Sequence, residues 1–245
     1  MALKLERYVK RYTSISSAID LLCRKQLALL DPQTWDDRND RYFMSLYKDY
    51  AKASGLYAAC FTQSAETYHH WRVFGGGADG ACVEFKRTKF EAHIKGNTDI
   101  RAGEVEYLLL TQAEKLSDPR PEQLPFMKRA GFEPEDEYRV VAISADPQGP
   151  SLALPIDLTL INRITINPWL PDAIYQSVKS VLREIRDCDH IEITRSSLID
   201  SQRWKNAGNQ VVGKPKMGRL VLKIGKRVAP KRKLKPPSRG KLKFR

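Results

Sequence analysis

The chain has 245 residues, of which 42% are hydrophobic and 29% are charged. This length and apolar content are typical of one folded domain with appendages. No apolar run approaches the ~20 residues of a membrane span, and the first residues lack the pattern of a secretory signal. We therefore expect a soluble, cytoplasmic protein without a membrane partner.

The net charge of +13 is concentrated at the C-terminal end. Residues 214–245 contain 14 Lys and Arg and no Asp or Glu, which leaves a net charge of −1 on the first 213 residues. We predict one domain over residues 1–213 and a basic tail over 214–245, with a short strand over 217–224 and disorder beyond about residue 228. Such a tail is suited to bind nucleic-acid phosphates, and a solubility tail or a sorting signal would have the same composition. Its candidate nucleic-acid-binding residues are Lys226, Arg227, Lys231, Arg232, Lys233 and Lys235.

The first 213 residues alternate between strand and helix patterns. The predicted strands cover residues 8–12, 27–30, 56–62, 80–85, 105–110, 138–143 and 191–194, with one or two more within 156–166. The predicted helices cover 15 to about 25, 41–52, 66–74 and 171 to about 186, and residues 113–135 are predicted to be irregular. Because several strands are separated by too little chain for regular βαβ crossovers, we expect an α+β domain and not a doubly wound sheet.

Four cysteines occur singly, without CxxC spacing, among apolar residues (Cys23, Cys60, Cys82 and Cys188). This pattern predicts reduced, buried thiols and no zinc site.

Two polar segments follow predicted strands. Residues 35–40 contain three aspartates that either cap the next helix or bind a cation, although they lack the spacing of a calcium loop. Residues 60–74 pass from the strand end at Thr62 to a helix with Tyr68, Trp71 and Arg72. Aromatic faces beside an arginine suit a base or a nicotinamide ring. Trp71 fits equally well as a core anchor, and the adjacent His69 and His70 cannot both face one metal.

A third segment, residues 133–139, leads into a predicted strand. If that strand begins near Asp136, Glu135 and Glu137 point to the same face. Two carboxylates at the mouth of a sheet can act as a catalytic pair. An edge strand with solvated charges and an internal Glu–Arg pair would show the same pattern.

Taken in order, these segments resemble a bacterial family, the domain of unknown function 2971, over residues 5 to 200. The matching pieces are Tyr8-Val-Lys-Arg-Tyr12, Leu27-Ala-Leu-Leu-Asp-Pro32, Trp35-Asp-Asp-Arg-Asn-Asp40, Cys60-Phe-Thr-Gln-Ser64, Trp71-Arg-Val-Phe74, Gly80-Ala-Cys-Val-Glu-Phe85 and Glu135-Asp-Glu-Tyr-Arg139. The basic tail lies outside the resemblance.

The layout is also similar to that of ADP-ribosyltransferases, including the DNA-modifying toxin branch and the RNA 2′-phosphotransferases, with Tyr12 where those proteins usually have a His. The similarity implies a mixed split sheet with flanking helices and a cleft that binds NAD. It implies a toxin or phage-defence effector that acts on nucleic acid or an associated target, with a protein partner or antitoxin. The implied catalytic residues are Glu137, then Glu135, with Tyr12, and the implied NAD-binding residues are Arg11, Thr13, Thr62, Tyr68, Trp71 and Arg72.

Two alternatives stay open at the level of sequence. The first is a non-enzymatic module that binds nucleic acid through its tail and a partner protein through its body. The second is a nuclease in which Asp36, Asp37, Asp40 and Glu137 gather Mg²⁺. The arrangement of these acids distinguishes the hypotheses, because a nuclease needs Asp37, Asp40 and Glu137 within metal-bridging reach.

Overall fold

The computed structural model describes residues 7–146 and 149–213. The chain divides into two compact units, residues 1–201 and residues 202–245. The described part of the second unit is one helix, α7 (Gln202–Gly213). The predicted strand over 217–224, the predicted disorder and all six candidate tail residues lie outside the described residues, so the boundary near residue 213 stays a prediction.

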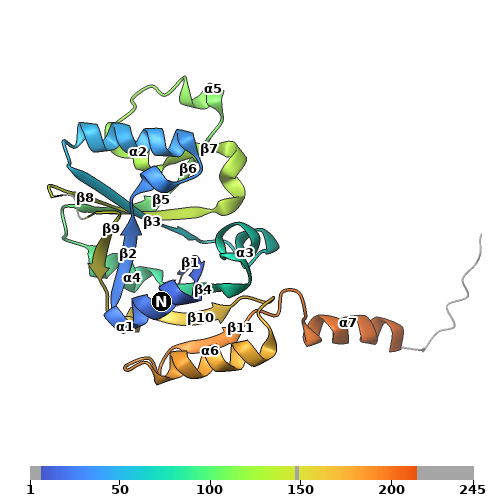
Figure 1. Ribbon diagram of the computed structural model, residues 1–245. Helices are drawn as coiled ribbons and strands as arrows, with labels where there is room; N and C mark the ends of the chain where they lie inside the picture. Colours follow the sequence, from blue (N-terminus) through green and yellow to red (C-terminus); the bar gives the residue numbers. More distant parts are fainter. Residues whose placement is uncertain (1–6, 147–148, 214–245) are drawn as a thin grey trace, which may run out of the picture. The chain divides into compact units, whose positions relative to one another are not determined.

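The main unit is a mixed α+β fold (Figure 1). Its first half contains β1 (Tyr8–Ser14), α1 (Ile15–Arg24), β2 (Gln26–Leu30), η1 (Pro32–Thr34), α2 (Arg38–Tyr50), β3 (Gly55–Thr62), α3 (Tyr68–Phe74), η2 (Gly77–Asp79), β4 (Gly80–Lys86) and α4 (Arg87–Ile94). Its second half contains β5 (Ile100–Glu104), β6 (Glu106–Leu108), α5 (Leu110–Ala113), η3 (Pro121–Phe126), β7 (Met127–Arg129), η4 (Ala130–Glu135), β8 (Glu137–Ser144), β9 (Ser151–Pro155), η5 (Leu158–Leu160), β10 (Ile161–Ile166), α6 (Asp172–Glu184) and β11 (Glu192–Arg195).

Nine of the described strands form one sheet that splits beside β3. On one side, β3 pairs with β8 along its whole length, from Gly55↔Ser144 to Thr62↔Glu137. On the other side, β3 meets β2 at Leu30↔Ala58 and β1 at Lys10↔Thr62. Strands β1 and β2, which share this second edge of β3, therefore diverge from each other. One half of the sheet is β9-β2-β3-β8-β5, and the other is β1-β4-β10-β11. The sheet is mixed, since β10 and β11 are parallel and the other pairs are antiparallel. The predicted α+β class and mixed split sheet are thus observed.

Helices cover both faces of the sheet (Figure 1). The larger apolar core takes side chains from α1, α4 and α6, together with alternate residues of β3 and β8 such as Phe61 and Tyr138. A smaller core lies between α2 and the opposite face of the same two strands, where Met44 and Tyr47 pack on Ala58 and Val141. Because β-strand side chains alternate between faces, polar residues of β3 and β8 in register with Ala58 and Val141 face α2.

The start of β4 is packed tightly against the end of α3 at Gly80. A Cβ added to Gly80 would lie 1.9 Å from the carbonyl oxygen of Gly75, so no larger residue fits there without moving the backbone. This contact fixes α3 beside β1 and β4, and the Trp71 side chain at the centre of α3 is buried.

The sequence-based elements differ from the structure mainly in regions of low apolar content. Helices α4 and α7 and strands β5 and β9 were not predicted, and the irregular segment 113–135 contains β7 and two 3₁₀ helices. Strand β8 begins at Glu137, because Asp136 adopts a left-handed conformation with φ 44°. The expectation of buried thiols is wrong for Cys23 and Cys60, which are exposed, although all four cysteines are free. Among the residues that the structure describes, every helix is too short or too polar to span a bilayer.

Phe90 of α4 should be a strong determinant of stability. Its ring is fully buried and lies 5.6 Å from that of Phe61 and 5.4 Å from that of Phe85. Phe90→Ala is expected to lower the free energy of unfolding by about 3–5 kcal/mol, because it leaves a cavity in the larger core. Urea denaturation measures this loss, with Tyr42→Ala on the exposed side of α2 as a control that changes little. A loss below about 1 kcal/mol would contradict the assigned packing of α4.

Candidate active site

A cleft of about 470 Å³ opens where the sheet splits. Small side chains on β3, Ala58 and Ala59, lie at this position and leave room between the diverging strands. Its lining comes from β1 (Lys10, Arg11, Tyr12), the end of β2 (Leu30), the segment before and within α2 (Thr34, Trp35, Asp36, Asp37, Asp40), β3 (Ala58, Ala59, Cys60, Phe61, Thr62), α3 (His70, Val73, Phe74), and the segment from β7 to β8 (Lys128, Phe132, Glu135, Glu137, Arg139). The volume lies within the range of small-molecule sites.

A network of buried charges lies along one wall of this cleft. The side chain of Arg139 is fully buried and donates to Glu137 from Nε (2.6 Å) and Nη2 (2.8 Å). It also donates to both oxygens of Asp40, at 2.7 and 2.5 Å, and to the carbonyl oxygen of Pro125 at 2.9 Å. Lys128 joins the same group through Nζ, which lies 2.5 Å from Glu135 and 3.3 Å from Glu137.

Local sequence explains how the network is assembled. Asp37 caps α2 by accepting from the backbone N–H groups of Asn39 and Asp40, and the helix then places Asp40, Met44 and Tyr47 on its buried face. On β8, the alternation of a strand places Glu137 and Arg139 on the face toward α2. Asp40 and Arg139 are 99 residues apart in sequence, so only the packing of α2 on the sheet brings them together.

The network keeps Glu137 ionised. Burial alone would raise the pKa of Glu137, but the ion pair and hydrogen bonds with Arg139 outweigh it and lower the pKa to about 2. Glu135 differs, since burial raises the pKa of its carboxyl group against the opposing effect of Lys128. The pKa of Glu135 is therefore raised and that of Glu137 is lowered, although both carboxylates contact Lys128.

The backbone of Glu137 is held as firmly as its side chain. Its N–H donates to Tyr107 Oη at 2.9 Å, and its carbonyl accepts from the N–H of Val105 at 2.9 Å. Next to it, the thiol of Cys60 is accessible from the cleft, yet desolvation and the neighbouring Glu137 carboxylate raise the pKa of Cys60. The predicted catalytic carboxylate is thus fixed in position at the cleft wall.

The part of the lining that comes from β1 and α3 carries polar groups that lack partners. Among the described residues, Arg11 makes no ion pair, and its Nη1 is buried without a hydrogen-bond acceptor. Burial lowers the pKa of Arg11. Tyr12 Oη and His70 Nε2 are likewise buried without partners, although their rings stack at 5.3 Å. Unsatisfied buried polar groups are rare in folded proteins, and three around one cleft indicate a polar ligand.

The predicted site residues fall into two groups. Arg11, Tyr12, Thr62, Glu135 and Glu137 line the cleft together. Four others, Thr13, Tyr68, Trp71 and Arg72, lie outside its lining.

For Trp71 the structure corrects the expectation of a cofactor platform. Its side chain is only 1% exposed, packs edge-on against Tyr12 and donates to Glu66, so it is a core anchor. Sequence reasoning missed Lys128, which comes from the segment predicted to be irregular, and Tyr107, which lies within the predicted strand 105–110.

The acids do not form a metal site in the described residues, where no three metal-ligating side chains lie close enough together. Asp40 and Glu137 meet through the guanidinium of Arg139, which stands where a bridging cation would have to lie. The nearby Asp37 is engaged in capping α2.

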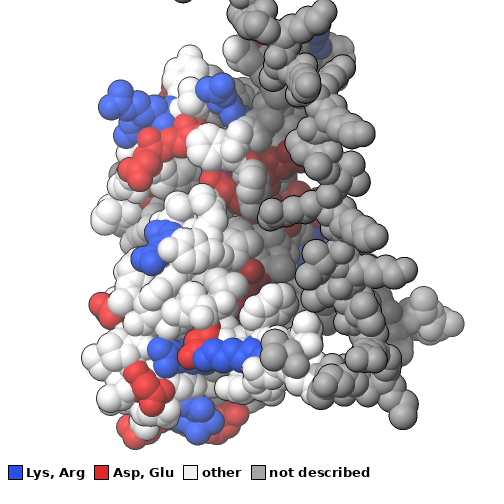
Figure 2. All heavy atoms as spheres, turned by 90° about the vertical axis from the view of Figure 1, so that its right-hand side faces the viewer, with Lys and Arg blue, Asp and Glu red and all other residues white. Residues whose placement is uncertain are grey.

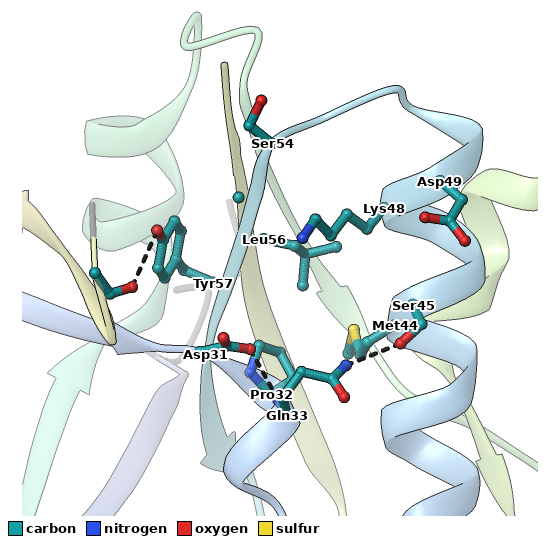
Figure 3. A pocket seen from close by; sticks show the side chains of 12 residues that line it. Asp31, Pro32, Gln33, Met44, Ser45, Lys48, Asp49, Ser54, Leu56 and Tyr57 are labelled. Carbon is teal, nitrogen blue, oxygen red and sulfur yellow. Dashed lines mark hydrogen bonds between the residues drawn. The ribbon is translucent and has the colours of Figure 1, made fainter. Parts of the chain in front are cut away.

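A second hollow of similar volume lies between η1, α2 and the start of β3 (Figure 3). Some of its polar groups bond one another, since Gln33 donates to Ser45 and Tyr57 donates to the carbonyl of Gly149. Figure 3 shows Lys48 extending across this hollow toward Leu56. None of the predicted site residues lines it, and the cleft at the split is the better candidate.

Comparisons with known proteins add a distant structural likeness. No family model and no curated protein matches the chain, so membership of the domain of unknown function 2971 family is not confirmed. The structure is similar to Thermus sp. 2.9 DarT in complex with NAD+, at 11% identity and a TM-score of 0.41, over 80% of this chain and 98% of that one. Thermus sp. 2.9 DarT in complex with ADP-ribosylated ssDNA gives 10% identity and a TM-score of 0.41, over 80% and 97% of the two chains. At this level the likeness assigns no activity.

The low pKa of Glu137 predicts how its contribution to stability depends on pH. Between pH 2 and about pH 4.5, the unfolded chain binds a proton at this carboxyl that the folded chain does not, so the stability due to Glu137 rises with pH in this window. Glu137→Gln should therefore destabilise the protein more at neutral pH than at about pH 3, because the stabilisation due to the lowered pKa reaches its full value only above about pH 4.5, where the unfolded chain has also lost this proton. Denaturant titrations of both proteins at the two pH values measure the difference. An equal loss at both pH values would show that the carboxylate is not held ionised.

Proposed function

We propose that the protein is an ADP-ribosyltransferase-like enzyme that uses NAD and modifies a nucleic acid or a nucleic-acid-associated target. One observation carries the proposal: the ionised Glu137 and the unpaired guanidinium of Arg11 both line one cavity. A suitable substrate has an anionic part and a part that becomes positive during the reaction. The diphosphate of NAD is the first, and the ribose that releases nicotinamide is the second.

The unpartnered groups fit such a substrate. The buried Nη1 of Arg11 can donate to a diphosphate oxygen, which would restore the charge balance that the folded chain lacks there. Tyr12 Oη and His70 Nε2 supply two further hydrogen-bonding groups of the kind that ribose and phosphate use. Val73 and Phe74 add an apolar wall on the side of α3. The same residues would be costly to keep in a purely structural cleft.

Glu137 is suited to stabilise positive charge on the ribose. A carboxylate has about four acceptor sites, and Arg139 and Lys128 occupy three of those on Glu137. The fourth faces the thiol of Cys60, a weak donor that a ribose hydroxyl can replace. Because Arg139 fixes both oxygens, the charge is already oriented before substrate binds.

The transfer step assigns separate roles to the two acids. The bond from ribose carbon to the nicotinamide nitrogen breaks, and its electron pair leaves with nicotinamide. The nucleophilic atom of the acceptor forms a bond to the same carbon and loses a proton. Glu135 accepts that proton, because burial raises its pKa toward the range of a useful general base. In this proposal the basic tail supplies affinity for the target, and a role as a toxin or phage-defence effector with a protein partner is part of the same hypothesis.

Label transfer from NAD tests the proposed reaction. Purified full-length protein is incubated with NAD labelled in the adenylate part and with separate pools of DNA, RNA and protein. Wild type is expected to label one pool, and Glu137→Gln should reduce the rate by about 100-fold, because an oriented carboxylate is lost from the reacting ribose.

Glu84→Gln is the matched control for this experiment. Glu84 lies on β4, is partly buried and accepts from Asn162, but it does not line the cleft. It should leave the transfer rate within about twofold of wild type. The proposed function would be overturned if folded wild-type protein showed no label transfer and no nicotinamide release.

Substitution of Arg11 should affect binding and stability in opposite directions. Arg11→Met removes a buried, unpaired charge, so the free protein should be as stable as wild type or more stable. The same change should weaken binding of ADP-ribose by at least about tenfold, because a charge-assisted contact to the diphosphate is lost. Calorimetric titration with ADP-ribose and thermal unfolding of the free protein measure the two effects. A destabilised variant with unchanged affinity would mean that Arg11 is structural.

A further inference from the structure

The ring of His70 contacts Thr67 through one nitrogen and leaves the other unused in the cleft. His70 is 1% exposed and belongs to the cleft lining. Its Nδ1 lies 2.6 Å from Thr67 Oγ1, whereas its Nε2 is buried and has no hydrogen-bond partner among the described residues. Tyr12 stacks on the same ring, with the two planes 14° apart. The ring is therefore fixed in orientation, and one of its nitrogens is left for a ligand.

The hydrogen bonds of Thr67 determine which nitrogen of His70 carries the proton. Thr67 caps α3, and its Oγ1 accepts from the backbone N–H of His70 at 3.1 Å. In the part of the chain that the structure describes, Nδ1 is the other partner of this hydroxyl. If Nδ1 carried the proton, Oγ1 would accept twice and its own hydrogen would meet no acceptor. With Thr67 as the donor to Nδ1, both groups are satisfied and the ring proton lies on Nε2.

The surroundings keep the His70 ring neutral. Burial lowers the pKa of His70, and the backbone of Glu135 opposes this by favouring the protonated form. Of the titratable groups around the ring, His69 of α3 and Lys10 of β1 lower the pKa, and Asp136, just before β8, raises it. Because the pKa is lowered overall, the ring carries one proton at neutral pH. It can then donate from Nε2 but cannot accept there.

A donor at this position favours an acceptor on the ligand. The lining that β1 contributes also includes Lys10 and Arg11, and Arg11 Nη1 has no acceptor among the described residues. Ammonium, guanidinium and imidazole N–H groups are all donors, so a group with only acceptor oxygens satisfies them together. Phosphate is such a group, whereas an ammonium group on the ligand would place its own N–H against that of His70.

The described surface around the molecule offers no comparable selectivity on the face in Figure 2. There, positive and negative side chains are interspersed around a broad uncharged area. A surface of mixed sign exerts little net attraction on anions. On this part of the chain, selection for an anionic group therefore depends on the buried donors of the cleft.

We propose that Thr67 holds His70 in the tautomer with the proton on Nε2, and that this N–H donates to a phosphate-type oxygen of the ligand in the cleft. In this arrangement Thr67 is a positioning residue, because it acts on the ligand only through His70. The identity of the ligand as NAD rests on the proposed function, whereas the tautomer does not. A free diphosphate ion offers the same oxygens, and the test separates the two sources.

Nuclear magnetic resonance of the full-length protein with isotope-labelled histidine nitrogens measures the tautomer. At about pH 9, where the ring is neutral, a nitrogen that carries a proton differs clearly in chemical shift from one that does not. The chain has four histidines, and His70→Gln identifies the signals of His70. Wild type is expected to show a protonated Nε2 and an unprotonated Nδ1. An unprotonated Nε2 in wild type would overturn the proposal.

Substitutions of Thr67 should change the tautomer in opposite ways. Thr67→Ser retains the hydroxyl, so the His70 signals should match wild type and the affinity for ADP-ribose should stay within about twofold. Thr67→Asp still caps α3, but an ionised carboxylate has no hydrogen to donate and therefore favours a proton on Nδ1. Nε2 then lacks its proton, and calorimetric titration at about pH 9 should show ADP-ribose binding weakened by about tenfold.

Ala65→Asp is the matched control for the added charge. Ala65 precedes α3, is exposed and does not belong to the cleft lining. Its substitution should leave the His70 signals unchanged and the affinity for ADP-ribose within about twofold of wild type. Thermal unfolding checks that each variant is folded, and the wild-type tautomer tests the proposal even if a variant is not.

Two probes, ADP-ribose and inorganic pyrophosphate, separate the sources of the phosphate oxygen. Weaker binding of ADP-ribose by Thr67→Asp supports the contact in the ligand of the proposed function. Weaker binding of pyrophosphate alone, with no binding of ADP-ribose by wild type, retains the donor and rejects NAD as the ligand. The proposal is overturned if Thr67→Asp binds both probes as Ala65→Asp does.

Discussion

The buried guanidinium of Arg139 is the constraint on which the candidate site depends. A charge on the central face of a sheet is tolerated only when acceptors surround it, and removal of one partner from such a group is strongly destabilising. Here the acceptors come from α2, η3 and β8 itself, as Asp40, the carbonyl of Pro125 and Glu137. Arginine suits this place because it remains charged and binds two carboxylates with a rigid planar group. The packing of α2 on the sheet and the ionisation of Glu137 are thus consequences of one interaction.

Two arginines of the same cleft differ in whether their N–H groups have hydrogen-bond acceptors. Every donor direction of Arg139 that the structure describes meets an oxygen, whereas Arg11 is buried with an unpaired nitrogen. The first arrangement stabilises the folded chain, and the second opposes folding by desolvating a charge. Local rules of stability are most often broken where a protein needs a ligand to complete the site. Under the proposed function, Arg139 fixes the carboxylate that acts on the ribose, and Arg11 keeps a donor for the diphosphate.

The sequence reveals the parts of this site but not how they meet. Alternation of apolar residues predicts β3 and β8, and the acids before β8 draw attention to Glu135 and Glu137. Three decisive features depend on contacts that local patterns do not encode. The register that sets Cys60 beside Arg139 joins residues 79 positions apart. Lys128 comes from a segment of low periodicity and Tyr107 from a short predicted strand, and their roles follow from the paths of these two segments past β8. Trp71 is ambiguous from sequence, because a short helix can present a tryptophan to solvent or to the core, and only the contact at Gly80 decides.

The positive charge is distributed unevenly along the chain. Residues 1–213 are nearly neutral and residues 214–245 are strongly basic, so under the proposed function the long-range attraction to target phosphates comes from the tail. Such attraction acts on any nucleic acid and weakens with salt, and it cannot place one nucleotide at Glu137. Under the proposed function, placement therefore depends on short-range contacts of the cleft itself, where Arg11 and Tyr12 of β1 and His70 of α3 lie in the same lining as Glu135 and Glu137. A movement of β1 or α3 relative to β8 would then change substrate binding and reaction together.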